Sequence, residues 1–369
     1  MKRISSLDGL RAISILMVVL LHTVQHIGVS HQLGVFRLLE SSGTIGVYIF
    51  FVISGFLITT LLLREHARYG TISLRDFYLR RAFRILPPVY FYVAVMIVIS
   101  WKWKLGISIG NVCSALFFYS NYVLRPWTIG HFWTLSVEEQ FYFVWPLVLL
   151  FVLRRHGRAA AAWVAVAVIF ICPMIRIASY QFGNQYVRYI NGRSFQGCAD
   201  MIMFGCLLAL CSGSEPFERI YGYLARLWWI FPIILIGLLG PLDVIYGNHW
   251  LLPFGYTLDG ICIAVCVLWC VRNPESLTGK FLNWRPVKYV GVLSYSIYIW
   301  QQLFLNVDNV ELFGAHFDLK YIPVFFVAMA VASVFSYHVI EKPALRLRDT
   351  VEKKLKLAHA SAERVVVVE

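Results

Sequence analysis

The sequence predicts an all-α protein, a polytopic bundle of about ten transmembrane helices with both termini in the cytoplasm. Hydrophobic residues make up 59% of the 369 positions and charged residues only 14%, which lies outside the range of soluble domains. The net charge of +13 is divided among short clusters between apolar runs, so it forms no basic patch of the kind that binds nucleic acid. We therefore expect a membrane protein with lipids around it and no nucleic-acid partner.

Ten apolar runs are long enough to cross a bilayer. They cover residues 10–28, 43–63, 84–101, 131–153, 159–178, 197–212, 226–242, 250–271, 289–307 and 320–340. The first run resembles a signal peptide but lacks a cleavage site, so we expect it to be retained. An eleventh run, residues 106–122, is marginal. Counting it as a span would invert every later loop, so we interpret it as a re-entrant or surface segment on the outer side.

Basic residues orient these spans, because loops that stay in the cytoplasm carry the excess of lysine and arginine. With the N-terminus inside, the even-numbered loops and the C-terminal tail carry the arginine and lysine clusters, and the opposite loops are sparser in them. The sequence therefore predicts a membrane domain over residues 1–345 and a charged cytoplasmic tail over residues 346–369. The oligomeric state is left open.

The first span carries Arg11 and His22 in the stretch LDGLRAISILMVVLLHT. At ~3.6 residues per turn their spacing is about three turns, so both side chains share one helix face, roughly 16 Å apart along the axis. An imidazole near the middle of a ~30 Å hydrocarbon core is costly unless it faces protein or water, which indicates a functional site. In the alternative, Arg11 only anchors the helix and His22 only bonds a neighbouring helix.

An arginine-rich segment, SLRDFYLRRAFRILPPVY, precedes the third span. Its arginines are Arg75, Arg80, Arg81 and Arg84. They alternate with apolar residues at helical spacing, which predicts an interfacial helix that Pro87 and Pro88 convert into a span. One interpretation is contact with anionic lipid headgroups. The other is a phosphorylated ligand, which arginine without lysine favours.

Two adjacent acids, Glu138 and Glu139, lie in the apolar segment GHFWTLSVEEQFYFVWP. Helix rise places them roughly 10 Å inside the outer surface, where packing alone does not explain two carboxylates. We expect one of them to orient the His22 imidazole and to stabilise its protonated form. In the alternative, one carboxylate salt-bridges a neighbouring span and the other faces a wet vestibule. We interpret His131, at the mouth of this span, as an interfacial residue.

Polar residues also lie within two later spans. The segment LSYSIYIWQQ contains Tyr295, Tyr298 and Gln301. Tyrosines commonly decorate membrane interfaces, but Gln301 lies too deep for that explanation. Asp200 is a further acid inside a span. We take Gln301 and Asp200 as candidates for binding the acceptor substrate.

Together these residues place arginines on the inner face, a deep histidine with acids, and polar aromatic side chains along the route between them. This layout suits a long anionic donor that enters from the cytoplasm. Coenzyme A has phosphates for the arginines and a thin pantetheine arm able to cross the ~16 Å from Arg11 to His22. An acyl thioester at His22 would meet a hydroxyl from the outer side, with His22 as general base. The candidate donor-binding residues are Arg11, Arg80, Arg81, Arg84, Tyr295 and Tyr298.

Several segments resemble the acyltransferase-3 family, whose ten-span membrane proteins O-acylate cell-surface carbohydrates. The stretch LDGLRAISILMVVLLH resembles the family's arginine and histidine motif, here Arg11 and His22. Its second-span signature, arginine motif and glutamate motif are similar to GVYIFFVISGFLIT, FYLRRAFRILPPVY and FWTLSVEEQFYFVWP. Its C-terminal landmarks are similar to LSYSIYIW and SYHVIEKPALR. These matches follow one order over nearly the whole chain.

The resemblance implies an acyl-CoA-dependent O-acyltransferase of the inner membrane. It implies acetyl-CoA or a related acyl-CoA as the donor, His22 as the catalytic histidine, and Glu138 or Glu139 as its support. The acceptor is then a hydroxyl of a carbohydrate or glycolipid. Lipopolysaccharide, capsule, exopolysaccharide, peptidoglycan, lipid-linked oligosaccharide and nodulation-type oligosaccharide all stay open. Eight scattered cysteines have no metal-ligand spacing, so no metal is expected.

Two positions depart from the family pattern. Gln301 stands where members often have histidine, and Cys198 stands where they have an arginine two residues before the acid, here Asp200. Both departures leave the donor side intact. A second hypothesis is a proton-coupled transporter of a glycolipid or small anion, because intramembrane histidine and glutamate also mark proton relays. Transporters commonly show internal repeats, and none is visible in this sequence.

Overall fold

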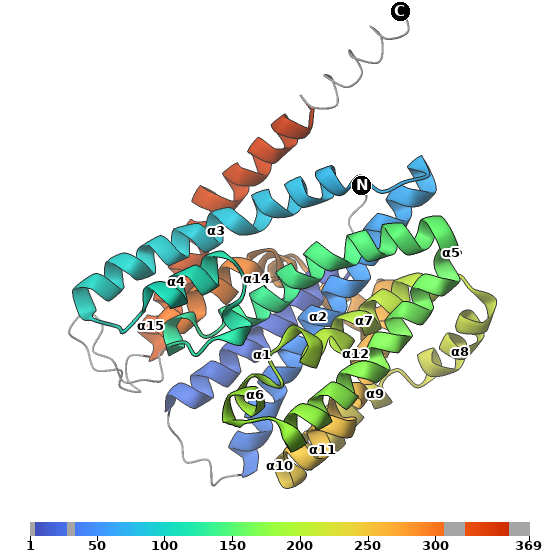
Figure 1. Ribbon diagram of the computed structural model, residues 1–369, viewed down its shortest axis with the longest axis horizontal. Helices are drawn as coiled ribbons and strands as arrows, with labels where there is room; N and C mark the ends of the chain where they lie inside the picture. The colour runs from blue at the N-terminus through green and yellow to red at the C-terminus, as the bar shows by residue number, and fades with distance from the viewer. Residues whose placement is uncertain (1–3, 28–33, 306–321, 354–369) are drawn as a thin grey trace, which may run out of the picture.

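The computed structural model describes residues 4–27, 34–305 and 322–353 of the chain. These ranges contain helices and no β-strand, so the predicted all-α class is confirmed for them (Figure 1). The long helices are α1 (Leu7–Ile27), α2 (Gly34–Tyr69), α3 (Leu74–Trp103), α5 (Phe132–Phe182), α7 (Phe195–Cys211), α12 (Tyr256–Arg272), α14 (Arg285–Phe304) and α15 (Ile322–Phe335).

Shorter helical elements connect the long ones. They are α4 (Ile109–Leu116), η1 (Ser120–Tyr122), η2 (Trp127–Ile129), α6 (Gln185–Ile190), α8 (Glu215–Arg226), α9 (Ile230–Ile234), η3 (Leu235–Leu239), α10 (Gly240–Tyr246), α11 (Asn248–Trp250), η4 (Leu251–Gly255), α13 (Leu277–Leu282) and η6 (Ser336–Glu341). The expected surface segment, residues 106–122, holds only the eight-residue helix α4 and the turn η1. A helix of eight residues is far too short to cross a bilayer, in agreement with that interpretation.

Seven helical segments in the described ranges are long and apolar enough to cross a membrane. An eighth candidate is the pair formed by α8 and the helical run Ile230–Tyr246, which is bent by 69°. The chain is therefore a multi-pass membrane protein. The count of seven treats residues 127–182 as one segment, although Gly157 interrupts its helix with φ 77° and ψ −176°. It also leaves out the 20-residue helix α14, which carries the polar segment LSYSIYIWQQ.

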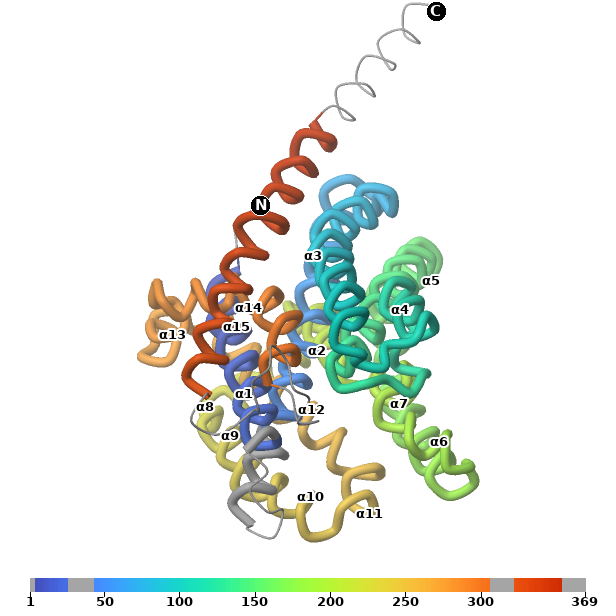
Figure 2. The backbone as a smooth tube through the Cα atoms, turned by 90° about the vertical axis from the view of Figure 1, so that its left-hand side faces the viewer, coloured from blue at the N-terminus to red at the C-terminus, as the bar shows by residue number. Residues whose placement is uncertain are grey.

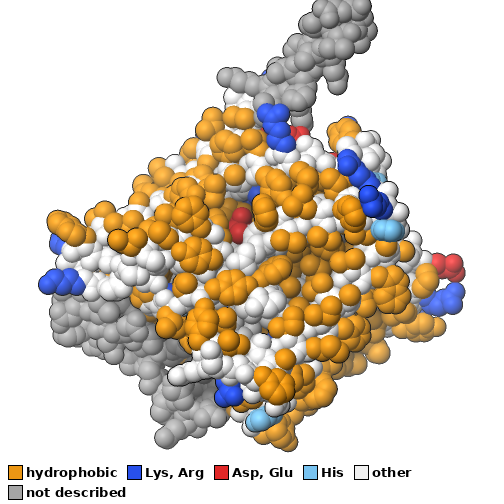
Figure 3. Space-filling model, viewed as in Figure 1, with side chains coloured by type: hydrophobic (Ala, Val, Ile, Leu, Met, Phe, Trp, Pro, Cys, Tyr) orange, Lys and Arg blue, Asp and Glu red, His pale blue; other side chains and the backbone are white. Residues whose placement is uncertain are grey.

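Helix α7 lies at the centre of the bundle, where residues 197–206 are all buried. It packs against α2 and α5, α2 packs against α1, and α1 packs against α14. A helix that is hydrophobic on every side is one that other helices surround. Helices α3 and α5 form one outer face (Figure 2). Hydrophobic side chains dominate that face, with most lysine and arginine toward its edges and a small acidic patch near its centre (Figure 3).

Helix α3 is continuous from Leu74 to Trp103 and contains Pro87 and Pro88 within it. The Ser73 side chain caps its start by accepting the backbone N–H of Asp76. We expected an interfacial helix that these two prolines convert into a membrane span. The structure joins both parts into one helix, since the capped first turn and the tertiary packing on either side of the prolines sustain it. The segment that carries these arginines is therefore a continuous part of helix α3.

Both described ends of the chain lie at the same end of the bundle. The start of α1 and the end of the C-terminal helix both lie toward the upper end of the molecule in two perpendicular views (Figures 1 and 2). The helical segment that begins at Ile322 runs to Lys353, past the expected domain boundary at residue 345. The rest of the predicted tail, residues 354–369, lies outside the described residues.

Helices α2 and α7 approach each other closely at two glycines. A Cβ on Gly55 would lie 2.0 Å from the carbonyl oxygen of Ile202, and a Cβ on Gly205 would lie 2.0 Å from that of Val52. Small residues allow this backbone contact between membrane helices. Glycine at these two positions therefore sets the distance between the central helices.

We predict that Gly205→Val destabilises the protein by roughly 1–3 kcal/mol, because the added side chain forces the α2 and α7 backbones apart. The thermal unfolding midpoint of the purified protein in detergent measures this loss. Gly222→Ala is the control, since a Cβ at Gly222 has no neighbour within 4 Å. An unchanged midpoint for Gly205→Val would contradict the close contact.

Candidate active site

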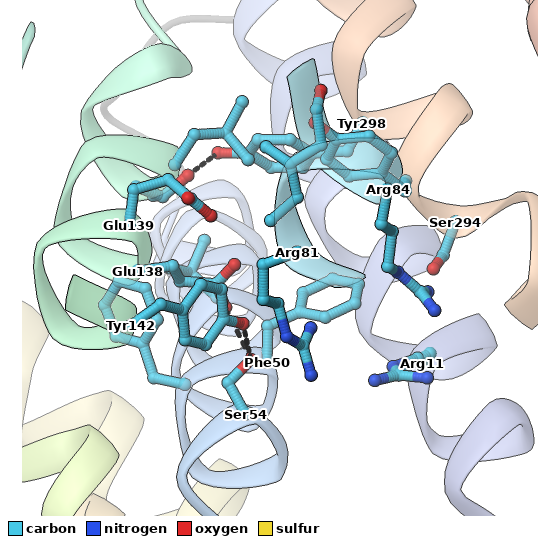
Figure 4. A pocket seen from close by; sticks show the side chains of 16 residues that line it. Arg11, Phe50, Ser54, Arg81, Arg84, Glu138, Glu139, Tyr142, Ser294 and Tyr298 are labelled. Carbon is cyan, nitrogen blue, oxygen red and sulfur yellow. Dashed lines mark hydrogen bonds between the residues drawn. The ribbon is translucent and has the colours of Figure 1, made fainter. Parts of the chain in front are cut away.

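A cavity of about 80 Å³ lies between α1, α2, α3, α5 and α14, with three arginines in its wall (Figure 4). Arg11 comes from α1, and Arg81 and Arg84 come from α3. Residues three positions apart share a helix face, so Arg81 and Arg84 reach the cavity together. We call this space the arginine cavity. It has room for several water molecules or for a thin chain.

Arg80 lies outside the arginine cavity, although we expected it beside Arg81 and Arg84. Its Nη2 lies 3.2 Å from Oε2 of Glu65 on α2, and neither residue lines the cavity. Consecutive helix residues point ~100° apart, so Arg80 and Arg81 face different surroundings. The Arg84 guanidinium has no hydrogen-bond or ion-pair partner within the described ranges, so its N–H donors are available to a ligand. Arg11, Arg81 and Arg84 therefore share the cavity, and Arg80 does not line it.

Carboxyl groups from α5 complete the arginine cavity. Glu138 and Glu139 both line it, and the Ser54 hydroxyl donates to Oε1 of Glu138 at 2.7 Å. Tyr142 donates to the same Ser54 oxygen at 3.1 Å, and its ring lies 4.8 Å from the Arg81 guanidinium carbon. The formal charges of the three arginines and two glutamates in this wall sum to one positive charge. The charges compensate one another when buried, and the surplus favours an anionic ligand.

Helix α14 supplies the two predicted tyrosines. Tyr295 lines the arginine cavity, and its hydroxyl donates to the carbonyl of Ile85 on α3 at 3.0 Å. Tyr298 lies one turn further along, where its hydroxyl is bonded to the carbonyl of His131 at 3.0 Å and to the side chain of Thr134. Both phenols are therefore held in place by neighbouring helices, with their rings turned to the cavity.

A second cavity of about 710 Å³, here called the outer cavity, lies on the other side of Tyr298. Residues from α1, α2, α5, α14 and the segments around positions 125, 190 and 250 form its wall. His22 is part of this wall, whereas Arg11 is part of the arginine cavity. Arg11 and His22, on one face of α1, therefore line two adjacent cavities.

Two glutamine side chains hold the His22 ring. Nδ1 of His22 lies 2.6 Å from Oε1 of Gln301, and Nε2 lies 3.4 Å from the amide nitrogen of Gln302. An amide oxygen only accepts hydrogen bonds, so Nδ1 carries the proton and Nε2 keeps its lone pair. The Trp127 ring packs edge-on against the imidazole at 5.1 Å. This is the tautomer that a general base needs.

The neighbours of the His22 ring are amides where we expected a carboxylate. Glu138 and Glu139 line the arginine cavity and not the outer cavity, because α5 turns them toward the guanidiniums. Gln301, which we expected to bind the acceptor, instead holds the imidazole. The two carboxylates and the imidazole are separated because α14 packs against α1 and places glutamines beside the histidine.

Gln302 joins His22 to a second histidine, His131. The Oε1 atom of Gln302 accepts from the backbone N–H of His131 at 2.8 Å and from its Nδ1 at 2.9 Å. His131 is only 1% exposed, so it is a buried part of the outer cavity wall and the interfacial interpretation is wrong. Its Nε2 has no hydrogen-bond partner within the described ranges. Neither Gln302 nor this role of His131 was identified from the sequence, although adjacent glutamines deep in a span were a signal for it.

Three cavities follow one another along α1 and α14. Val47 and Tyr298 line both the arginine cavity and the outer cavity. On the other side, Arg11 and Arg84 line both the arginine cavity and a third cavity of about 280 Å³, which we call the inner vestibule. The series leads from the start of α1 to His22.

Asp200 lines neither the arginine cavity nor the outer cavity. Its Oδ2 lies 2.8 Å from Nη1 of Arg176 on α5, and both side chains are fully buried. Arg176 also donates to the carbonyl of Gly197 at 2.8 Å, and its guanidinium carbon lies 4.3 Å from the centre of the Tyr256 ring. We expected Asp200 to bind the acceptor. The structure instead makes it an anchor between α5 and α7, with the arginine supplied from α5 while position 198 holds cysteine.

The family of this chain follows from comparison with known proteins. A family described as an acyltransferase domain matches residues 4–340, nearly the whole chain. The chain belongs to the acyltransferase-3 family. The resemblance of the motifs is thereby confirmed, and membership in an acyltransferase family favours acyl transfer over the transporter hypothesis.

Relatives of this acyltransferase-3 protein are bacterial. It is 29% identical over 377 residues to YrhL of Bacillus subtilis (strain 168), covering 92% of this chain and 54% of that protein. It is 27% identical to "O-acetyltransferase OatA" of Staphylococcus aureus (strain NCTC 8325 / PS 47), covering 91% and 56%. It is 26% identical to "Peptidoglycan O-acetyltransferase OatA" of Listeria monocytogenes, covering 81% and 49%. The chain therefore spans about half the length of these relatives. No solved structure matches it.

We predict that Arg176→Met and Asp200→Leu each destabilise the protein by roughly 3–5 kcal/mol, because each leaves one charge buried without its partner. The double variant should be more stable than either single variant. Thermal unfolding midpoints of the three purified variants measure this coupling. Arg219→Met, which breaks the exposed pair with Glu215, is the control and should change little. Additive losses in the double variant would contradict the ion pair.

Proposed function

We propose that this protein transfers an acetyl group from acetyl-CoA, bound from the cytoplasm, to a hydroxyl of a carbohydrate or glycolipid on the outer side of the membrane. The observation that carries this proposal is the series of three cavities with guanidiniums at its inner end and the imidazole of His22 at its outer end. The names of the relatives support acetyl as the group that is moved and peptidoglycan as the acceptor polymer.

The donor is held by the arginines of the inner half. Arg11 and Arg84 line the inner vestibule and the arginine cavity together, so phosphates at this junction would receive charge-assisted bonds from both guanidiniums. The pantetheine arm would then occupy the narrow arginine cavity, between Arg81 and Tyr295, and reach Tyr298. The reactive thioester would thus approach His22 while the nucleotide stays on the inner side.

The transfer step uses His22 as general base. The acceptor hydroxyl gives its proton to Nε2 of His22, and the hydroxyl oxygen bonds to the carbonyl carbon of the thioester. The carbon–sulfur bond breaks, and the CoA thiolate takes the proton from the imidazolium and leaves as the thiol. Gln301 keeps the other ring proton on Nδ1 throughout, which fixes the ring orientation. Glu138 and Glu139 support the site by holding the donor-side guanidiniums.

We further propose ten crossings of the inner membrane with both termini in the cytoplasm. Ten result when residues 127–182 are divided at Gly157, and when α14 and the bent pair are each counted as one crossing. The common location of the two described ends agrees with an even number (Figure 1). The arginine-rich start of α3 near Glu65 agrees with a cytoplasmic end.

We predict that His22→Ala lowers the rate of acetyl transfer by roughly 10²–10⁴-fold, because the acceptor hydroxyl loses its base. The measurement is transfer from acetyl-CoA to a soluble glycan by the purified protein, followed by mass spectrometry. His156→Ala, which removes an exposed histidine far from the cavities, is the control and should retain activity. Full transfer activity in His22→Ala would refute the catalytic assignment.

We predict that Arg84→Ala weakens the binding of CoA by roughly 10–100-fold, because it removes a charge-assisted phosphate contact. Arg11→Ala should behave alike. Arg80→Ala is a closely matched control, because it removes the same charge from the same helix but from outside the arginine cavity. Thermal stabilisation of each variant by CoA gives the affinities. Equal stabilisation of Arg84→Ala and Arg80→Ala would refute the donor site.

A further inference from the structure

Among the residues that the structure describes, the charged side chains of the outer cavity all have one sign. Arg125, Arg188 and Arg193 line it, and no aspartate or glutamate is among the described residues of its wall. Burial and the positive charge of Arg193 lower the pKa of Arg125 to about 10, so the Arg125 guanidinium remains charged at neutral pH. A cavity with this surplus of positive charge is favourable for an anion.

Arg125 and Arg193 differ in how many hydrogen bonds their guanidiniums already make within the protein. Arg125 donates to the backbone carbonyls of Ser120, Val123 and Gly130 at 2.7–2.9 Å, which fixes it as part of the wall. The Arg193 guanidinium carbon lies 5.0 Å from the centre of the Tyr189 ring, and this guanidinium has no hydrogen-bond or ion-pair partner in the part of the chain that the structure describes. Its five N–H donors are therefore free for a ligand.

Two buried polar atoms of the same wall also lack partners. Nε2 of His131 and Oδ1 of Asn191 have none within the described ranges, and the two residues are 1% and 5% exposed. The His131 Nδ1 proton goes to Gln302, so Nε2 is an acceptor, as is the Asn191 oxygen. Burying an acceptor without a donor is costly, so a ligand that brings hydroxyl or amide N–H groups would relieve this cost.

Aromatic rings supply the apolar part of the wall. Trp127, Trp133 and Tyr189 line the cavity together with the polar groups, which is the composition of a site that binds a ring-shaped ligand and orients it by a few polar contacts. The volume of about 710 Å³ is in the range of sites that enclose such ligands.

We propose that the outer cavity selects an acidic sugar unit as acceptor, with the anionic group bound by Arg193 and with hydroxyl or acetamide N–H groups donated to His131 and Asn191. This inference rests on the proposed function, because it specifies the acceptor of that reaction. The anion is a carboxylate or a phosphate on the sugar, since a guanidinium binds both in the same way. A neutral sugar would leave the positive charges of the wall uncompensated.

The test measures glycan binding without any donor. The purified full-length chain in detergent is titrated with N-acetylmuramic acid, N-acetylglucosamine 1-phosphate and neutral N-acetylglucosamine, and thermal stabilisation gives the affinities. We expect one or both acidic sugars to bind at least tenfold more tightly than the neutral one, and we expect added salt to reduce the difference. The better of the two acids identifies the carboxylate or the phosphate as the anion that is recognised.

Variants assign the effect to the cavity. Arg193→Gln should lose the tenfold preference, Arg193→Lys should retain part of it, and Lys102→Gln, which removes an exposed charge elsewhere on the outer side, should retain all of it. Stabilisation by CoA, measured in the same samples, reports that each variant is folded. His131→Phe should weaken all three sugars, because it removes an acceptor that the neutral sugar also uses.

The outcomes separate this inference from the proposed function. Equal affinity of the wild type for acidic and neutral sugars would overturn the acidic acceptor, while acetyl transfer to the neutral sugar would leave the proposed function intact. A preference that persists unchanged in Arg193→Gln would also overturn it. Conversely, an acidic preference in a protein that neither binds CoA nor transfers acetyl would uphold this binding site and refute the acyltransferase proposal.

Discussion

An ionisable side chain inside the hydrocarbon core has to face protein or water, and this constraint organises the bundle. Arg11 and His22 lie on the face of α1 that α2 and α14 cover, and each borders a cavity. The outer face formed by α3 and α5 is mostly hydrophobic (Figure 3). The charged and polar groups are thereby gathered along one axis, which is also a route from one side of the bundle toward the other.

The partner of the catalytic candidate is neutral. A carboxylate beside His22 would favour a permanently charged imidazolium, whereas the amide of Gln301 fixes the ring without adding a charge to the interior. The carboxylates are placed one cavity away, where guanidiniums compensate them. The arginines and glutamates therefore lie together at the arginine cavity, and the imidazole has no charged partner at the boundary of the outer cavity. This division explains how two acids and a histidine share one membrane domain without forming a single ion-paired cluster.

Contacts outside the two cavities fix the positions of α2, α5 and α7 relative to one another. The buried pair of Arg176 and Asp200 ties α5 to α7, and the glycine contact ties α7 to α2. Since α2 carries Ser54 and Val47, and α5 carries the glutamates, the walls of both cavities are fixed by contacts outside them. An aspartate that looked like a binding residue thus contributes to the site by packing, because its charge is fully satisfied by an arginine 24 residues away.

By itself the sequence determined the helices, the family motifs and the faces of single helices. Backbone hydrogen bonding repeats every ~3.6 residues, so the shared face of Arg11 and His22 and that of Arg81 and Arg84 follow from spacing alone. Only the tertiary structure decided which side chains on different helices form hydrogen bonds with one another. Gln301 lies 279 residues from His22, and Gln302 lies 171 residues from His131. Local periodicity fixes where a side chain points on its own helix, but which helix lies opposite depends on the packing of the whole bundle, and no local pattern encodes that.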